Sequence, residues 1–136
     1  MIYIDTSAAM KLVRSEVQSN DLSAWLRERG QSAVLSSVLI EVELIRATRR
    51  SAPEQLHRAA EILRGIGVVT LSPAVVSRAS AYTDANLRSL DAIHLATAEH
   101  VLTLTRERLD AFVAYDDRLL AAAQSVGLPT VAPGTA

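Results

Sequence analysis

Short apolar runs alternate along the chain with longer amphipathic stretches. The apolar runs predict strands at 1–4, 33–35, 68–71 and 111–115, with a short edge strand at 128–131. The stretches between them predict helices at 8–14, 21–29, 38–50, 53–65, 73–87, 90–104 and 118–125. Strands that are apolar throughout are typical of parallel sheets, and their alternation with helices is typical of α/β domains. We therefore expect an α/β fold with a central, mainly parallel sheet of four or five strands.

Polar side chains stand where many of these helices should begin. Hydroxyl and carboxylate oxygens at such positions accept hydrogen bonds from free backbone N–H groups. The candidate caps are Thr6 or Ser7, Ser36 or Ser37, Ser72, Ser89, and Asp116 or Asp117.

Length, composition and charge narrow the class of protein. The 136 residues, 49% of them hydrophobic, predict one folded domain at 1–132 and a flexible tail at 133–136. There is no cysteine for a disulfide or a thiolate metal site. No apolar run approaches the roughly 18 residues of a membrane helix, and no basic segment opens the chain, so we expect a cytoplasmic protein. A net charge of −1 argues against a broadly basic nucleic-acid module, but not against an enzyme that contacts nucleic acid locally.

Four segments of the chain carry acidic residues in unusually apolar surroundings. Asp5 and Asp116 each follow a predicted strand, and Asp91 lies in the first turn of the most apolar predicted helix. Glu41 and Glu43 lie in another apolar stretch and point to different faces of their helix, so at most one of them faces the core. Asp116 alone is explained as a helix cap and Asp91 alone by the helix dipole, whereas Asp5 is harder to explain because Thr6 or Ser7 can cap the helix that follows it.

Taken together, the acids favour a metal site. In open α/β sheets, ligands bind at the carboxyl ends of the strands, where Asp5 and Asp116 are predicted to lie. A cluster of carboxylates is tolerable when cations balance its charge, and magnesium or manganese prefers oxygen ligands. Such an arrangement suits hydrolysis of phosphodiester bonds. We expect the two strands to be parallel neighbours, with their acids opening on the same edge of the sheet.

The segments that contain these acids resemble the PIN domain family and, within it, the VapC toxins of bacterial toxin–antitoxin pairs. The four segments are 1–8 (MIYIDTSA), 35–47 (LSSVLIEVELIRA), 87–98 (LRSLDAIHLATA) and 112–123 (FVAYDDRLLAAA). Their order and spacing make the resemblance specific across nearly the whole chain. The family often has a hydroxyl residue two positions before the fourth acid, where this chain has Ala114. The resemblance implies a three-layer α/β/α fold.

The resemblance also implies a set of site residues. It makes Asp5, Glu43, Asp91 and Asp116 the catalytic acids, with Asp5 and Asp91 as direct ligands of Mg²⁺, for which Mn²⁺ can substitute. Glu43 and Asp116 are expected to act through water or a second ion. The adjacent Asp117 leaves the identity of the fourth acid open, and its position as an exposed first-turn residue favours Asp116.

The function implied is that of a magnesium-dependent endoribonuclease. Such a toxin cuts an RNA, for example a tRNA or an rRNA, and thereby inhibits translation. Members of the family usually form homodimers and are held inactive by a cognate VapB-type antitoxin that covers the acidic groove. Contact with DNA is expected only through the antitoxin, and no contact with a membrane is expected.

Five further residues have two interpretations each. Thr6 and Ser7 can orient a metal-bound water or cap a helix. Arg46 can contact phosphate or pair with an acid. His94 shares a helix face with Asp91 and is more typical of a packed or hydrogen-bonded core histidine than of a general acid. Trp25 is more typical of core or antitoxin-facing packing than of stacking on an RNA base.

Two other functions compete with the nuclease. A phosphatase would use Asp5 as a nucleophile, but such enzymes usually have a second acid two residues later, where this chain has Ser7. A catalytically silent PIN fold that serves as a binding module is the other alternative, although all four acids are present.

Overall fold

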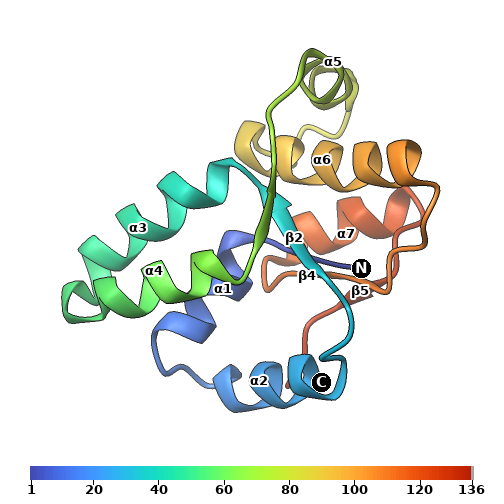
Figure 1. Cartoon of the computed structure of the whole chain (residues 1–136). Helices are drawn as coiled ribbons and strands as arrows, with labels where there is room; N and C mark the ends of the chain where they lie inside the picture. The colour runs from blue at the N-terminus through green and yellow to red at the C-terminus, as the bar shows by residue number, and fades with distance from the viewer. Residues whose placement is uncertain (136) are drawn as a thin grey trace.

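Five parallel strands form the centre of the molecule. The computed structural model describes residues 1–135, and the sheet has the strand order β3-β2-β1-β4-β5 (Figure 1). The strands are β1 (Ile2–Ile4), β2 (Val34–Ser37), β3 (Gly67–Val69), β4 (Ala111–Val113) and β5 (Thr130–Val131). All four strand pairings are parallel. The expected parallel sheet is thereby confirmed.

Helices connect the strands and cover both faces of the sheet (Figure 1). They are α1 (Thr6–Val13), α2 (Ser19–Glu28), α3 (Leu39–Ser51), α4 (Leu56–Arg64), α5 (Pro73–Ala81), α6 (Ser89–Thr105) and α7 (Asp117–Ser125), with a 3₁₀ turn, η1 (Pro53–Gln55), before α4. Among the described residues, no helix is long and apolar enough to cross a bilayer. The architecture is the expected three-layer α/β/α sandwich.

The side chains of β1 alternate between the two faces of the sheet and so belong to two separate halves of the core. Ile2 and Ile4 pack with helices α1 to α4 on one face of the sheet. Tyr3 points to the opposite face and packs with Phe112 and with residues of α6 and α7. Successive side chains of a strand point to opposite faces, so a three-residue strand that is buried throughout serves both layers.

The order in which the chain adds strands to the sheet changes side at β1. From β1 the chain proceeds to β2 and β3 on one side of the sheet, whereas β4 and β5 lie on the other. Ile4 is level with Val113, and the Asp5 N–H donates to the Val113 carbonyl at 3.1 Å. The strands that precede Asp5 and Asp116 are therefore parallel neighbours, as expected, and their carboxyl ends meet at a topological switch point.

Two of the expected helix caps were wrong, and a third is confirmed only in part. Asp5, rather than Thr6 or Ser7, caps α1 and accepts the Ala8 N–H. Ser36 and Ser37 belong to β2, because pairing with β3 continues through Val69 before α3 begins at Leu39, but the Ser37 hydroxyl oxygen does accept the Leu39 N–H at 3.2 Å. Ser89 is the first residue of α6 and makes no capping bond. The caps at Asp116 and Ser72 are confirmed.

The helix expected at 73–87 is also shorter than predicted. It ends at Ala81, because Tyr82 is extended with ψ 133°. The Asp84 carboxylate then accepts the Asn86 N–H at 2.9 Å, which stabilises a turn in place of a further helical turn. This turn leads into α6, and α5 packs across that helix (Figure 1).

The C-terminal residues lie against the body of the domain up to Thr135. Gly127 follows α7 with φ of 82°, a conformation that favours glycine, and the chain then enters β5. Pro133 is buried, and its carbonyl accepts the Tyr115 hydroxyl at 2.7 Å. The last residue of the expected tail, Ala136, lies outside the described residues.

Candidate active site

Asp5 stands at the end of β1 and is only 4% exposed. Its carboxylate accepts the Ala8 N–H at 3.0 Å and the Ser7 hydroxyl, which lies 2.7 and 2.9 Å from the two oxygens. The Ser7 oxygen in turn accepts the Tyr115 N–H at 3.0 Å, so it links α1 to the end of β4. Burial raises the pKa of Asp5 to about 6, from an ordinary 3.8. The fold therefore holds a carboxyl group where its ionised form is costly.

Asp116 occupies the corresponding place beyond β4. It is the N-cap of α7, and its Oδ1 accepts the N–H groups of Arg118 and Leu119 at 2.9 and 3.0 Å. Asp117 is the exposed first residue of the helix and makes no capping bond. Of the two neighbouring acids, Asp116 is the one that the backbone holds in a defined position.

Asp91 comes from the first turn of α6, the most deeply buried helix of the domain. Burial raises the pKa of Asp91, and the nearby negative charges of Asp116 and Glu43 raise it further. Asp91 also raises the pKa of Asp5. Its carboxylate thus lies within electrostatic reach of the other three acids.

Glu43 projects from α3 and is half-buried, whereas Glu41 is exposed on the same helix. Oε1 of Glu43 accepts a hydrogen bond from the Thr6 hydroxyl at 2.9 Å and lies 2.7 Å from His94 Nε2. Burial alone would raise the pKa of Glu43, but the hydrogen bonds from His94 and Thr6 hold that pKa below its ordinary value. Glu43 is therefore the acid of α3 that takes part in the site.

His94 is a hydrogen-bonded core histidine, the more typical of the two interpretations. It is 2% exposed, with Nδ1 lying 2.8 Å from the Tyr3 hydroxyl and Nε2 facing Glu43. The sequence analysis did not foresee the bond to Glu43. The available signal was that His94 follows Asp91 by three residues and so shares its helix face.

The four acids thus gather at the carboxyl edge of the sheet from β1, α3, α6 and the β4–α7 turn. A groove of about 460 Å³ opens at this edge. It is lined by Arg88, Asp91, Tyr115, Asp116, Asp117 and Arg118. In the part of the chain that the structure describes, no lysine or arginine forms an ion pair with any of the four acids.

The donor set fits a hard divalent cation. Carboxylate oxygens are its preferred ligands, and mutual repulsion disfavours their shared ionisation without one. Over residues 1–135, no three Asp, Glu or His side chains lie close enough together to surround an ion by themselves. Magnesium is usually held by one or two carboxylates and keeps several of its waters, so it suits this spacing.

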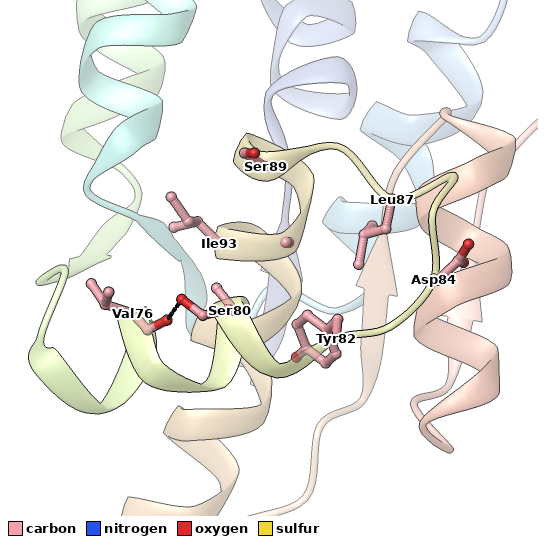
Figure 2. Close-up of a pocket in the computed structure, with 9 residues that line it drawn as sticks. Val76, Ser80, Tyr82, Asp84, Leu87, Ser89 and Ile93 are labelled. Carbon is pink, nitrogen blue, oxygen red and sulfur yellow. Dashed lines mark hydrogen bonds between the residues drawn. The ribbon is translucent and has the colours of Figure 1, made fainter.

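A separate cavity of about 330 Å³ lies between α5 and α6 and contains none of the four acids. Figure 2 shows Val76, Tyr82, Leu87 and Ile93 around it. The hydroxyl of Ser80, which lines this cavity, donates to the Val76 carbonyl at 2.8 Å, one turn earlier on the same helix. Asp84 also lines the cavity, but among the described residues no hydrogen bond joins its carboxylate to Ser80.

The remaining candidates divide between the site and the surface. Thr6 and Ser7 both donate to site acids. Arg46 is exposed on α3 and has no acidic partner among the described residues. Trp25 packs against the core, and the Arg29 guanidinium lies 4.0 Å above its ring. The phosphatase alternative is disfavoured, because the position two residues after Asp5, where such enzymes usually have a second acid, is Ser7, and its hydroxyl donates to the Asp5 carboxylate.

Comparison with known proteins shows the family of this chain. A sequence profile of the PIN domain matches residues 2–125. The chain belongs to the PIN domain family. Ribonuclease VapC35 of Mycobacterium tuberculosis is 44% identical over 136 residues, covering 100% of this chain and 99% of that protein. Ribonuclease VapC47 of the same organism is 42% identical over 138 residues, covering 98% of each. These relatives place this PIN domain in the VapC group.

A solved structure confirms the fold of this PIN domain at lower sequence similarity. A chain of a toxin–antitoxin complex from Klebsiella pneumoniae superposes with a TM-score of 0.67 at 20% identity. The match covers 98% of both chains. The arrangement of strands and helices is therefore shared along the whole length.

Proposed function

We propose that this PIN domain is the toxin of a toxin–antitoxin pair and acts as a metal-dependent endoribonuclease. Ribonucleases of the family are generally metal-dependent, and the relatives of this chain are named ribonucleases. The observation that carries the proposal is the meeting of four carboxylates from separate segments at the switch point of the sheet, with no lysine or arginine paired to them in the described chain.

Each acid has a proposed role that follows from its position. Asp5 and Asp91 hold Mg²⁺, or Mn²⁺ in its place, because burial raises the pKa of both carboxyl groups and a bound cation would offset the cost of their ionised forms. Glu43 and Asp116 orient water or hold a second ion. The metal, when bound, polarises the phosphodiester and lowers the pKa of a bound water.

Two arginines are placed to hold the RNA backbone. Arg88 and Arg118 line the same groove as Asp91 and Asp116. A planar guanidinium binds phosphate oxygens in a bidentate way, so these side chains can hold phosphates on either side of the reacting one. They also offset the repulsion between the acidic groove and an anionic substrate. This gives a local contact with nucleic acid in a chain of near-neutral charge.

The same acidic groove suits inhibition by a VapB-type antitoxin. We propose that a basic side chain of the antitoxin, an arginine, enters the groove and pairs with two carboxylates at once. It would replace the charge of the metal, so metal binding and inhibition would compete.

A homodimer is the proposed oligomeric state of the toxin. Large apolar side chains are exposed on three helices around the site: Val42 on α3 at 60%, Val76 on α5 at 47% and Leu90 on α6 at 50%. Exposed apolar groups of this kind are typical of protein interfaces. Val42 and Leu90 precede Glu43 and Asp91 directly, so the partner would lie close to the acidic groove.

The decisive experiment compares the wild-type protein with Asp5→Asn on a panel of labelled RNAs. We expect wild-type cleavage with Mg²⁺ or Mn²⁺, none with a chelator, and none by the variant. Sequencing of RNA 5′ ends after expression without the antitoxin would identify the cleaved RNA.

Two outcomes would point elsewhere. Hydrolysis of a phosphomonoester without RNA cleavage would support the phosphatase. Tight RNA or protein binding by wild type and Asp5→Asn alike, with no cleavage by either, would support the silent binding module.

A further inference from the structure

A buried chain of hydrogen bonds leads from the backbone of β2 to the Glu43 carboxylate. The Ser37 N–H donates to the Tyr3 hydroxyl oxygen at 3.0 Å, and that oxygen lies 2.8 Å from His94 Nδ1. His94 Nε2 lies 2.7 Å from Glu43 Oε1. The chain therefore links β2, β1, α6 and α3, four elements that the folded sheet brings together.

The direction of the bond to Glu43 follows from the chemistry of the groups. The Tyr3 oxygen accepts from the Ser37 N–H, and the hydrogen between that oxygen and Nδ1 can belong to either group. An ionised Glu43 can only accept, so Nε2 must carry the hydrogen that lies between the two side chains. Nε2–H is therefore the donor that fixes the position of the Glu43 carboxylate oxygen.

One Glu43 oxygen receives both donors that the structure shows. Oε1 accepts from His94 and from the Thr6 hydroxyl at 2.9 Å. Among the described residues, no donor is bonded to Oε2. The side chain of a glutamate has three rotatable bonds, and two donors on one oxygen select a single orientation from its rotamers. Oε2 is thereby left for an ion or for water.

We propose that Tyr3 and His94 are positioning residues for Glu43, and that they act by holding its carboxylate in one orientation toward the metal site. This inference rests on the proposed function, because it takes Glu43 to be one of the four acids of the nuclease. Residues that orient metal-site side chains typically change metal affinity or activity by about 10–100-fold when replaced.

Two substitutions of His94 separate positioning from packing. The side-chain amide of glutamine can place an N–H group near the position of Nε2, whereas asparagine reaches only the position of Nδ1. We expect His94→Gln to keep kcat within about 3-fold of wild type. We expect His94→Asn to lower kcat about 10–100-fold, with little change in the KM for RNA. Mn²⁺ affinity, measured by calorimetry without RNA, should fall in the same order.

A variant on the far side of the imidazole keeps the test usable if His94→Asn does not fold. Tyr3→Phe removes the hydroxyl and leaves the ring, which is stacked on Phe112 with centroids 5.1 Å apart. We expect a smaller fall in kcat and in Mn²⁺ affinity than for His94→Asn. In wild-type protein, ¹⁵N NMR of the imidazole should show a hydrogen on Nε2.

Thr48→Val is the matched control for lost buried hydrogen bonds. Thr48 is also fully buried on α3, and its hydroxyl donates to the Leu44 carbonyl at 2.7 Å without touching Glu43. We expect it to lower thermal stability while leaving kcat and Mn²⁺ affinity at wild-type values.

The Glu43→Gln variant distinguishes a failure of the positioning inference from a failure of the proposed function. If Glu43→Gln cleaves RNA as well as wild type, the assignment of Glu43 to the nuclease site is wrong. If Glu43→Gln is inactive while folded His94→Asn and Tyr3→Phe keep wild-type kcat and Mn²⁺ affinity, the acids are assigned correctly and the positioning inference is overturned.

Discussion

The Asp5 carboxyl group shows, at the scale of a single residue, how a functional group burdens a fold. It is buried at the end of β1 and has three donated hydrogen-bond contacts, yet burial still raises its pKa to about 6. A buried charge without a cation costs free energy of folding. The Asp5 side chain has this cost at the N-cap of α1, where hydrogen bonds keep it in one place.

The stability of Asp5→Asn should show this cost directly. Because the pKa of Asp5 is higher in the folded state than the ordinary 3.8, stability falls as pH rises from about 4 to about 6 and stays low above that. Asparagine carries no charge and keeps an acceptor for Ala8. Without metal at pH 7.5, the variant should therefore be more stable than wild type, by up to about 3 kcal/mol.

Urea denaturation in the presence of a chelator measures this difference. The gap between variant and wild type should narrow as the pH is lowered from 6.5 to 4. Mn²⁺ should stabilise the wild type, since a ligand of the folded state adds stability by mass action, and should stabilise Asp5→Asn much less. An asparagine variant that is less stable than wild type at pH 7.5 would mean that the carboxylate is not a burden to the fold.

At the scale of elements, the helix termini carry both structure and chemistry. Asp5 caps α1 and Asp116 caps α7, so the two strand-end acids are held by the free N–H groups of the helices that follow. The helix dipole favours negative charge at the same positions. An acid that both caps a helix and faces a metal site contributes to stability and to cleavage. A substitution that keeps the cap but removes the carboxylate separates these two contributions.

Asp116→Ser and Asp117→Ala should separate these effects. Serine caps helices about as well as aspartate, so Asp116→Ser should change stability by less than about 0.5 kcal/mol, whereas Asp116→Ala should cost about 1 kcal/mol. Both should lose RNA cleavage, because both remove the carboxylate. Asp117→Ala should keep both stability and cleavage.

Thermal melts and cleavage rates of the three variants check this prediction. The result that would reassign the fourth acid is an inactive Asp117→Ala beside an active Asp116→Ser.

At the scale of the whole molecule, the acidic groove and its surroundings govern how partners bind. The groove has Arg88 and Arg118 beside Asp91 and Asp116, and exposed apolar side chains of α3, α5 and α6 lie outside it. Charge therefore dominates the groove, and apolar contact dominates the helices around it. The proposed antitoxin and the proposed second copy of the chain would use these two kinds of surface.

Metal should compete with the antitoxin. If a basic side chain of the antitoxin occupies the groove in place of the cation, saturating Mn²⁺ should speed dissociation of the complex and lower its affinity. Surface-immobilised complex, washed with increasing Mn²⁺, gives the off-rate, with NaCl at equal ionic strength to control for screening. An unchanged off-rate and affinity would mean that the antitoxin inhibits from another surface.

The oligomeric state should respond to Val76→Glu. This residue is exposed on α5, away from the four acids, so a charge there should weaken an apolar interface without touching the groove. Light scattering should show a dimer for wild type and a monomer for the variant, with unchanged Mn²⁺ affinity. Val76 and Ser80 both line the α5–α6 cavity, so Ser80→Glu tests whether the interface extends one turn further along α5. A wild-type monomer would contradict the dimer.

The sequence by itself determined the class of the fold and the residues around which the site is built. Apolar runs that are buried on both faces must lie inside a sheet, and helices between them make that sheet parallel. Asp5 and Asp116 could be placed at the same edge, because parallel strands end on the same side. Asp91 was found as an acid in an apolar helix, where an ionised group needs a reason to be present, whereas the choice of Glu43 over Glu41 came from the resemblance to PIN domains.

Only the tertiary structure decided how those residues are held. The bonds from His94 to Glu43 and from Ser7 to Tyr115 join residues 51 and 108 positions apart, and no local pattern encodes such distances. The caps were misassigned for a related reason. Several neighbouring side chains can cap a helix equally well in isolation, and strand pairing, as at Ser36 and Ser37, decides where the helix begins. Local periodicity thus specifies elements, whereas packing and long-range hydrogen bonds orient the groups that do the chemistry.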